Sequence, residues 1–176
     1  MVPSPLTLDL LTAMITPAVL ISACGTLIFS TSTRLARVVD RVRELTNAMD
    51  TLYAGAEGDF LEERRAEVER QLAIHAQRGR LIQWSLTSYY VSLGLFVGSA
   101  AAIGVAAFLH VAAWLPTTMG ILGTLALFYA SVLLINETRL AVRSVNAEMS
   151  FALKLRDLHV ERHREGEREL RVRAGP

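Results

Sequence analysis

Small and hydroxyl-bearing residues recur every four positions in the first long apolar run of this sequence. The row consists of Ala18, Ser22, Thr26 and Ser30. Residues four apart lie on one face of an α-helix, so these side chains share a face. Inside a membrane such a face allows close helix packing with interhelical hydrogen bonds. Alternatively, it lines the pore of a homo-oligomer, with Arg34 and Arg37 as a charged ring at the inner mouth.

Charged residues gather where the apolar runs end. This inner-boundary set consists of Arg34, Arg37, Asp40, Arg41, Arg80, Glu137 and Arg139. Glu137 lies on the membrane side of the basic flanks, where an ionisable group needs a charged partner or water. Arg34, Arg80 or Arg139 could be that partner. The set predicts an ion-paired collar or an ion-coordinating gate, and it could also contact anionic lipid headgroups.

A second stripe of small residues lies in the next apolar run. It consists of Gly94, Gly98, Ala102 and Ala106. Residues 94–98 read GLFVG, a GxxxG pattern that allows two membrane helices to approach closely. We expect this stripe to pack against another helix, either of this chain or of another copy.

The residues that most often carry catalysis or bind metals form no motif here. Cys24 is the one cysteine, so no intrachain disulfide is possible, and it lacks metal-ligand spacing. His159 and His163 are four residues apart, but the sequence places no third ligand near them. No HExxH, CxxC, Ser-His-Asp order or Gly-rich phosphate loop occurs. We expect neither an enzyme nor a bound cofactor or metal.

The distribution of charge divides the chain into membrane and aqueous segments. The composition is 52% hydrophobic and 20% charged, and all 18 Lys and Arg residues lie in residues 34–80 and 139–173. The uncharged run 10–33 would span roughly 36 Å as a helix, more than a hydrocarbon core of about 30 Å. Residues 81–109 and 117–135 are also uncharged. The sequence therefore predicts an all-α membrane protein with three transmembrane helices.

The charged segments have the patterns of helices that continue into water. Apolar residues at positions 35, 38, 42, 45, 49 and 52 alternate spacings of three and four, as in a coiled-coil seam. Residues 54–58 predict a turn, and Asp59 with Glu62 fits a capping box that begins the next helix. A turn this short predicts an antiparallel hairpin. Net charge is +1 with acids among the bases, which argues against a nucleic-acid partner.

Three spans place both basic flanks on the same side of the membrane, and the positive-inside rule assigns that side to the cytoplasm. The N-terminus is then outside and the C-terminus inside. The predicted segments are 1–33, an irregular lead-in through Leu8 and the first membrane helix; 34–80, a cytoplasmic antiparallel helical hairpin; 81–138, the second and third membrane helices with a short outer loop; 139–160, a cytoplasmic amphipathic helix; and 161–176, a charged, disordered tail.

Three segments have a distinctive sequence, namely residues 17–25 (PAVLISACG), 34–43 (RLARVVDRVR) and 137–142 (ETRLAV). They resemble a family of bacterial membrane proteins that is catalogued as domain of unknown function 2721. The resemblance covers most of residues 10–155 and is most specific in the first helix. It implies a bacterial inner-membrane protein with three spans, and it carries no activity.

Two functions fit these patterns. The first is a homo-oligomeric assembly in the lipid bilayer that forms an ion-conducting pore, since three spans alone bury little surface and the first span has a polar stripe. The second is a non-conducting scaffold or accessory subunit that binds a cytoplasmic protein partner through its water-exposed helices. The sequence does not separate them, because a stripe looks the same whether it faces a neighbour, water or lipid.

Overall fold

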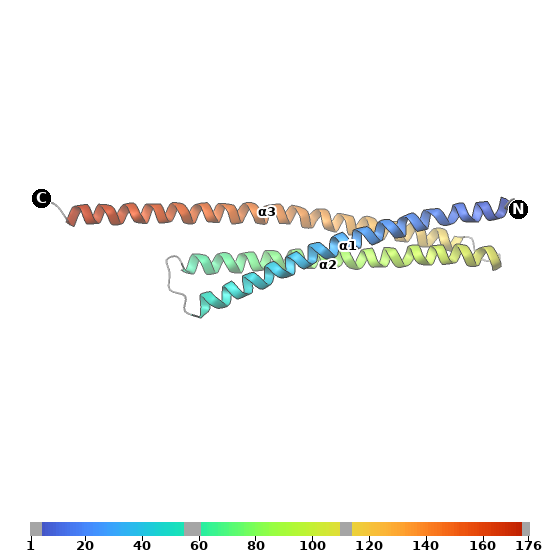
Figure 1. The fold of residues 1–176 in the computed structure, drawn as a ribbon, viewed down its shortest axis with the longest axis horizontal. Helices are drawn as coiled ribbons and strands as arrows, with labels where there is room; N and C mark the ends of the chain where they lie inside the picture. The colour runs from blue at the N-terminus through green and yellow to red at the C-terminus, as the bar shows by residue number, and fades with distance from the viewer. Residues whose placement is uncertain (1–4, 55–60, 110–113, 174–176) are drawn as a thin grey trace.

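Three long helices make up the described chain in the computed structural model (Figure 1). They are α1 (Pro5–Tyr53), α2 (Leu61–Leu109) and α3 (Trp114–Arg173). The structure describes residues 5–54, 61–109 and 114–173, with side chains over 12–54, 61–106 and 114–158 and at Val160 and Arg164. The predicted all-α class is confirmed over these ranges, and each helix contains a stretch long and apolar enough to cross a membrane.

Helix α2 is the central element of the fold. It contacts α1 and α3 extensively, whereas α1 and α3 meet only over a short stretch. Figure 1 shows α1 crossing α2, and α3 continuing well past the end at which α1 and α2 are joined. The core follows one face of α2, where Ile82, Tyr89 and Phe96 are almost fully buried at intervals of seven residues. Both neighbours therefore pack on a single helix and leave their own outer faces open.

Serine hydroxyls on α2 hold α3 by hydrogen bonds to its backbone. Ser85 donates to the carbonyl of Ala130 (2.9 Å), Ser92 to that of Gly123 (2.7 Å), and Ser99 to that of Pro116 (2.8 Å). Donors and acceptors are both seven residues apart and run in opposite directions, as an antiparallel pair requires. All three serines are buried. An unpaired hydroxyl in hydrocarbon is costly, so these bonds select one register of α2 on α3.

Arg78 continues the same series at the charged end of the helices. It lies seven residues before Ser85, and it binds Glu137, which lies seven residues after Ala130, with Nε–Oε1 and Nη2–Oε1 distances of 3.0 and 2.9 Å. We call these four contacts the polar ladder. The donors on α2 are Arg78, Ser85, Ser92 and Ser99.

Close approach of α2 and α3 also depends on one glycine. A Cβ atom at Gly123 would fall 2.8 Å from the Phe96 ring, whereas one at Gly94 would meet nothing within 4 Å. A methyl group at position 123 would therefore push against the core, because a ring wedged between two helices has little room to turn. Gly94 sets no such limit within this chain.

The structure differs from the sequence analysis at both ends of the chain. Residues 5–8, expected to be irregular, begin α1, because proline is tolerated in the first turn of a helix. Residues 161–173, expected to be disordered, continue α3. The predicted turn at 55–58, the cap at Asp59 and residues 110–113 of the outer loop lie outside the described residues.

Loss of the three serine hydroxyls should loosen α2 from α3. Replacing Ser85, Ser92 and Ser99 by alanine should lower the free energy of unfolding by about 2 kcal/mol, since interhelical hydrogen bonds in a membrane protein average about 0.6 kcal/mol each. Reversible unfolding in mixed micelles with increasing SDS measures the change.

The matched control removes three hydroxyls that each donate to a carbonyl four residues back in their own helix. These are Thr87, Ser88 and Thr124. Their alanine variants should change stability far less. Equal losses for the two triple variants would show that the ladder does not hold the helix pair.

Candidate functional site

A cavity of about 320 Å³ lies where the three helices converge at the charged end of the spans. Its walls come from all three helices, and we call it the arginine cavity. The lining residues are Arg34, Arg37, Val38 and Arg41 of α1, His75 and Arg78 of α2, and Glu137, Thr138 and Ala141 of α3.

Local helix geometry explains why these side chains meet. Arg34, Arg37 and Arg41 are three and four residues apart, so they project from one face of α1. Arg34 is the first charged residue after the uncharged run of α1, and Glu137 follows that of α3. The cavity therefore lies at the depth where both helices change from apolar to charged.

Glu137 is the most buried charged group of the site. Its side chain is 3% exposed, and it pairs with Arg78 at 2.9 Å and with Arg34 at 3.8 Å. A buried carboxylate without a cation would be strongly destabilising, so the Arg78 pair makes its burial possible. The sequence analysis named Arg34, Arg80 and Arg139 as possible partners. Arg80 and Arg139 are exposed, and in the described part of the chain neither pairs with Glu137.

His75 is buried beside Arg78 and lines the same cavity. Its Nδ1 lies 3.4 Å from Nη1 of Arg78, and since a guanidinium only donates, Nδ1 accepts and the neutral ring carries its proton on Nε2. Nε2 lies 3.7 Å from Oε1 of Glu148 and makes no hydrogen bond with any described group. Burial lowers the pKa of His75, with a further contribution from the positive charge of Arg78, while Glu148 acts in the opposite direction.

The remaining members of the inner-boundary set are divided between the cavity and the surface. Arg41 pairs with Glu44 at 3.0 Å and with Glu148 at 3.5 Å. Arg37 makes no ion pair among the residues that the structure describes. Asp40 pairs with Arg43 at 4.0 Å, outside the cavity lining. The fold thus brings together four of the seven predicted residues, namely Arg34, Arg37, Arg41 and Glu137.

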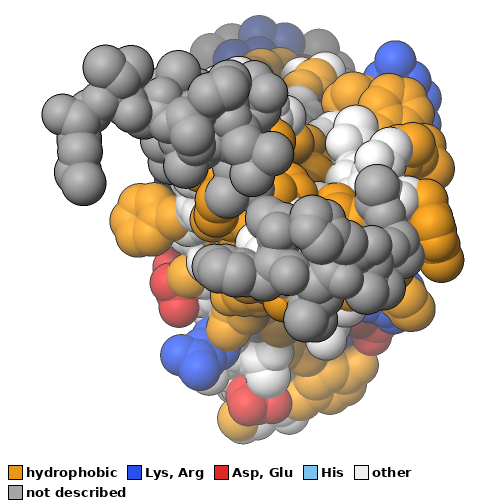
Figure 2. Space-filling model, turned by 90° about the vertical axis from the view of Figure 1, so that its right-hand side faces the viewer, with side chains coloured by type: hydrophobic (Ala, Val, Ile, Leu, Met, Phe, Trp, Pro, Cys, Tyr) orange, Lys and Arg blue, Asp and Glu red, His pale blue; other side chains and the backbone are white. Residues whose placement is uncertain are grey.

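The polar stripe of α1 faces away from both other helices. Its members Ala18, Ser22, Thr26 and Ser30 are all exposed. Thr26 donates to the carbonyl of Ser22 at 3.2 Å, which satisfies its hydroxyl within the helix. Within the described residues this face packs against neither α2 nor α3. The space-filling view from the N-terminal end shows hydrophobic side chains over much of the visible surface (Figure 2).

The small-residue stripe of α2 does not act as one surface. Gly94 is exposed, whereas Gly98 faces the Met119 side chain of α3. Ala102 is half-buried, and Ala106 lines an apolar cavity of about 730 Å³ that Pro17, Phe96 and Ile121 also border. Close packing of α2 on α3 therefore involves the serine row, Gly123 and one of the two glycines of the GxxxG pattern, Gly98.

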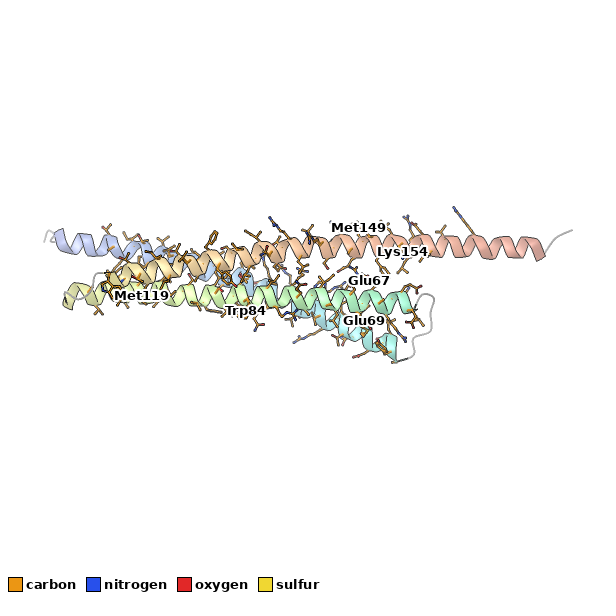
Figure 3. All side chains as sticks on the ribbon, turned by 180° about the vertical axis from the view of Figure 1, so that it is seen from behind. Glu67, Glu69, Trp84, Met119, Met149 and Lys154 are labelled. Carbon is orange, nitrogen blue, oxygen red and sulfur yellow. The ribbon has the colours of Figure 1, made fainter. Side chains whose placement is uncertain are left out.

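A second polar cluster lies farther along α2. Glu67 is 8% exposed and accepts hydrogen bonds from Arg70 (2.6 and 2.9 Å) and Gln71 (2.9 Å). Burial alone would raise the pKa of Glu67, but the bonds from Arg70 and Gln71 outweigh it and lower the pKa. Glu67 lies on the α3 side of α2, whereas Glu69 lies on the α1 side (Figure 3). Glu69 accepts a hydrogen bond of 3.1 Å from the Tyr53 hydroxyl. This cluster is already satisfied by its own partners.

Sequence analysis missed the residues of α2 that build the site. A signal was present, because Ser85, Ser92 and Ser99 are seven residues apart and Arg78 is in phase with them. His75 is likewise in phase with Ile82, Tyr89 and Phe96 at intervals of seven. The predicted packing surface of α2 rested on the four-residue spacing of glycines and alanines instead.

Acid should destabilise the protein through His75. The pKa of His75 in the folded protein lies below 6.5, the ordinary value for histidine. As the pH falls, the unfolded chain therefore takes up a proton before the folded protein does. The contribution of neutral His75 to the free energy of unfolding is fully present above pH 6.5, and it is lost as the pH falls from 6.5 toward the pKa of the folded state. Thermal unfolding in detergent at several pH values should show this loss. The groups that face the ring are Arg41, Arg78 and Glu148.

His75→Gln should flatten the stability profile between neutral pH and about pH 5. His163→Gln, which removes an imidazole near the end of α3, serves as the control and should leave the slope of the wild-type profile unchanged. A wild-type slope in His75→Gln would assign the acid sensitivity to other groups.

Comparison with known proteins identifies a family for this chain. No curated protein and no solved structure matches the chain. The three candidate membrane-spanning helices indicate a multi-pass membrane protein. The family model described as "Protein of unknown function (DUF2721)" matches residues 14–147, a range that contains the arginine cavity and the polar ladder. The chain therefore belongs to this family, as the resemblance of its first helix predicted.

Proposed function

We propose that this chain is a subunit of a homo-oligomeric assembly in a bacterial inner membrane. The basic ends of the helices face the cytoplasm, following the bias of arginine toward that side. The N-terminus is outside and the C-terminus inside. Copies meet along faces that the single chain leaves open.

The observation that carries this proposal is an apolar stripe on the outer face of α3. Val142, Val145, Met149 and Leu153 are each between 47% and 59% exposed, and they recur every three or four residues. Met149 lies on α3 away from α1 and α2 (Figure 3). These residues follow Arg139, where α3 has left the uncharged run and lipid no longer covers it. A continuous exposed apolar surface in water marks an interaction site.

Another copy of the chain fits this stripe well. Copies in one membrane share an orientation, so the α3 helices of neighbours run parallel and present the same residues at the same depth. On the membrane side of Arg139, which is exposed and occupies the intervening position on this face, further exposed apolar residues follow. They are Leu125, Phe128, Val132 and Ile135. A neighbouring α3 can therefore follow this face from the bilayer into water at the spacing of packed parallel helices.

The finer form of the proposal is an ion-conducting pore lined by α1. Its support is the outward row of Ser22, Thr26 and Ser30, which meets neither α2 nor α3. In a ring centred on α1 these hydroxyls would face the axis, and Arg34 and Arg37 would lie at the cytoplasmic mouth. Contacts between equivalent α3 residues would place α3 at the axis instead, so the two arrangements are alternatives. Rings of polar and charged side chains are a usual construction of ion pathways.

A cysteine at position 149 should crosslink one copy to the next. In a Cys24→Ser background, Met149→Cys should give disulfide-linked dimers on mild oxidation in native membranes, because parallel helices place equivalent residues opposite each other. Lys154→Cys is the control: it is exposed but lies about 140° around the helix, at 3.6 residues per turn. Equal crosslinking at both positions, or a monomer in native mass spectrometry, would contradict the oligomer.

Tryptophan in the α1 row should block conduction if the pore exists. Ser22→Trp and Thr26→Trp should each abolish the current of wild-type protein in planar bilayers, because an indole fills a narrow passage. Val91→Trp, at an exposed position of α2, should leave the current unchanged. Silence of the wild-type protein under all ionic conditions would reject the pore while leaving the oligomer standing.

The same α3 stripe supports a second candidate, a non-conducting scaffold that binds a different protein. In that case a benzophenone maleimide attached to Met149→Cys should crosslink to another protein rather than to a copy of itself. Adding Val142→Glu and Val145→Glu to that variant should then abolish the crosslink without lowering membrane insertion. The mass of the crosslinked product therefore separates the two candidates.

A further inference from the structure

We propose that the arginine cavity binds a phosphate group. The source is either the headgroup of an anionic phospholipid or a small soluble phosphate that enters from the aqueous side. This inference does not depend on the oligomer or on the pore, because every residue of the cavity comes from one chain.

The charge of the lining is the first support. Four guanidinium groups and a single carboxylate border the cavity. Arg78 is matched by Glu137 at 2.9 Å, and Arg41 by Glu44 at 3.0 Å and Glu148 at 3.5 Å. Arg34 has a longer ion pair of 3.8 Å with Glu137 and donates to the Thr138 hydroxyl at 3.5 Å, and Arg37 has no ion pair in the described part of the chain. Positive charge therefore remains uncompensated on the α1 wall.

An unused buried donor is the second support. His75 is 6% exposed, and its Nε2 forms no hydrogen bond with any group that the structure describes. Buried polar groups are normally satisfied, so an orphan donor in a cavity wall calls for a missing acceptor. Phosphate oxygens accept hydrogen bonds from imidazole and, in bidentate fashion, from guanidinium.

Size and position are the third support. The cavity of about 320 Å³ is roughly ten times the share of one water in the liquid, about 30 Å³, so it has room for a phosphate group with some of its water. Its lining includes Arg34, the first charge after an uncharged run, and Arg37, which is exposed. An arginine at this boundary lies at the level of the lipid phosphates, where polybasic segments attract anionic headgroups.

The test compares two single-charge variants. Arg37→Gln removes the unpaired guanidinium from the cavity and breaks no ion pair among the described residues, so the variant should fold. Arg43→Gln removes the same charge six residues along α1, from a side chain that is 77% exposed and does not line the cavity. Ala141→Leu fills the cavity without changing its charge.

The lipid arm measures binding of phosphatidylglycerol and phosphatidylcholine to the full chain in detergent by native mass spectrometry. We expect preference for phosphatidylglycerol, weakened about fivefold by Arg37→Gln, the effect of one basic residue near an anionic surface. Ala141→Leu should weaken it as well, and Arg43→Gln should not. Equal retention of both lipids, together with failure of the second arm, would overturn the proposal.

The soluble arm titrates inorganic phosphate at constant ionic strength into protein in phosphatidylcholine nanodiscs, with calorimetry as the readout. Binding that Arg37→Gln weakens and Arg43→Gln preserves identifies a soluble phosphate as the source. Binding in the lipid arm alone identifies the headgroup. Equal weakening by the two arginine variants in both arms would show attraction to net charge rather than a site, and would overturn the proposal.

Discussion

Helix α2 places a polar donor opposite an acceptor on its neighbour α3 every seven residues, and the arrangement of the protein follows from that requirement. Three serine hydroxyls find backbone carbonyls, and Arg78 finds Glu137. A hydrocarbon surrounding offers no substitute partner, so an unpaired group costs several times what a formed bond contributes. A shift of α3 by one residue would leave all four donors without their acceptors, and only one register satisfies them together.

The register of this helix pair also builds the arginine cavity. It places Glu137 beside Arg78, and the second oxygen of Glu137 then attracts Arg34 of α1. Three helices converge on one carboxylate at the end of the uncharged segments. Among the α1 arginines that line the cavity, Arg34 has only this long ion pair, and Arg37 has none in the described part of the chain. Positive charge therefore remains in the wall of the arginine cavity, together with the unpaired Nε2 donor of His75. Because Glu137 is paired with Arg78, the neighbouring arginines of α1 retain an excess of positive charge.

Two faces of the molecule remain open because α2 takes the inner faces of both other helices. The outer face of α1 carries hydroxyls, and that of α3 carries an apolar stripe that extends beyond Arg139. Lipid can cover each of them within the membrane, but in the proposed topology it does not reach Val145 or Met149, which lie beyond Arg139. For this reason the α3 stripe is the stronger argument for assembly, and the α1 row determines only what an assembly could conduct.

The sequence by itself determined the helical class, the three apolar segments and the family, because hydrocarbon excludes guanidinium groups and sorts residues along a chain without reference to tertiary contacts. It also indicated that residues such as Arg34 and Glu137 would gather at the ends of those segments. Only the tertiary structure decided that Arg78 pairs with Glu137, that Gly123 rather than Gly94 admits its neighbour, and that the α1 row faces outward. Periodicity assigns residues to a face of a helix, whereas the neighbour of that face depends on how helices distant in the chain pack together.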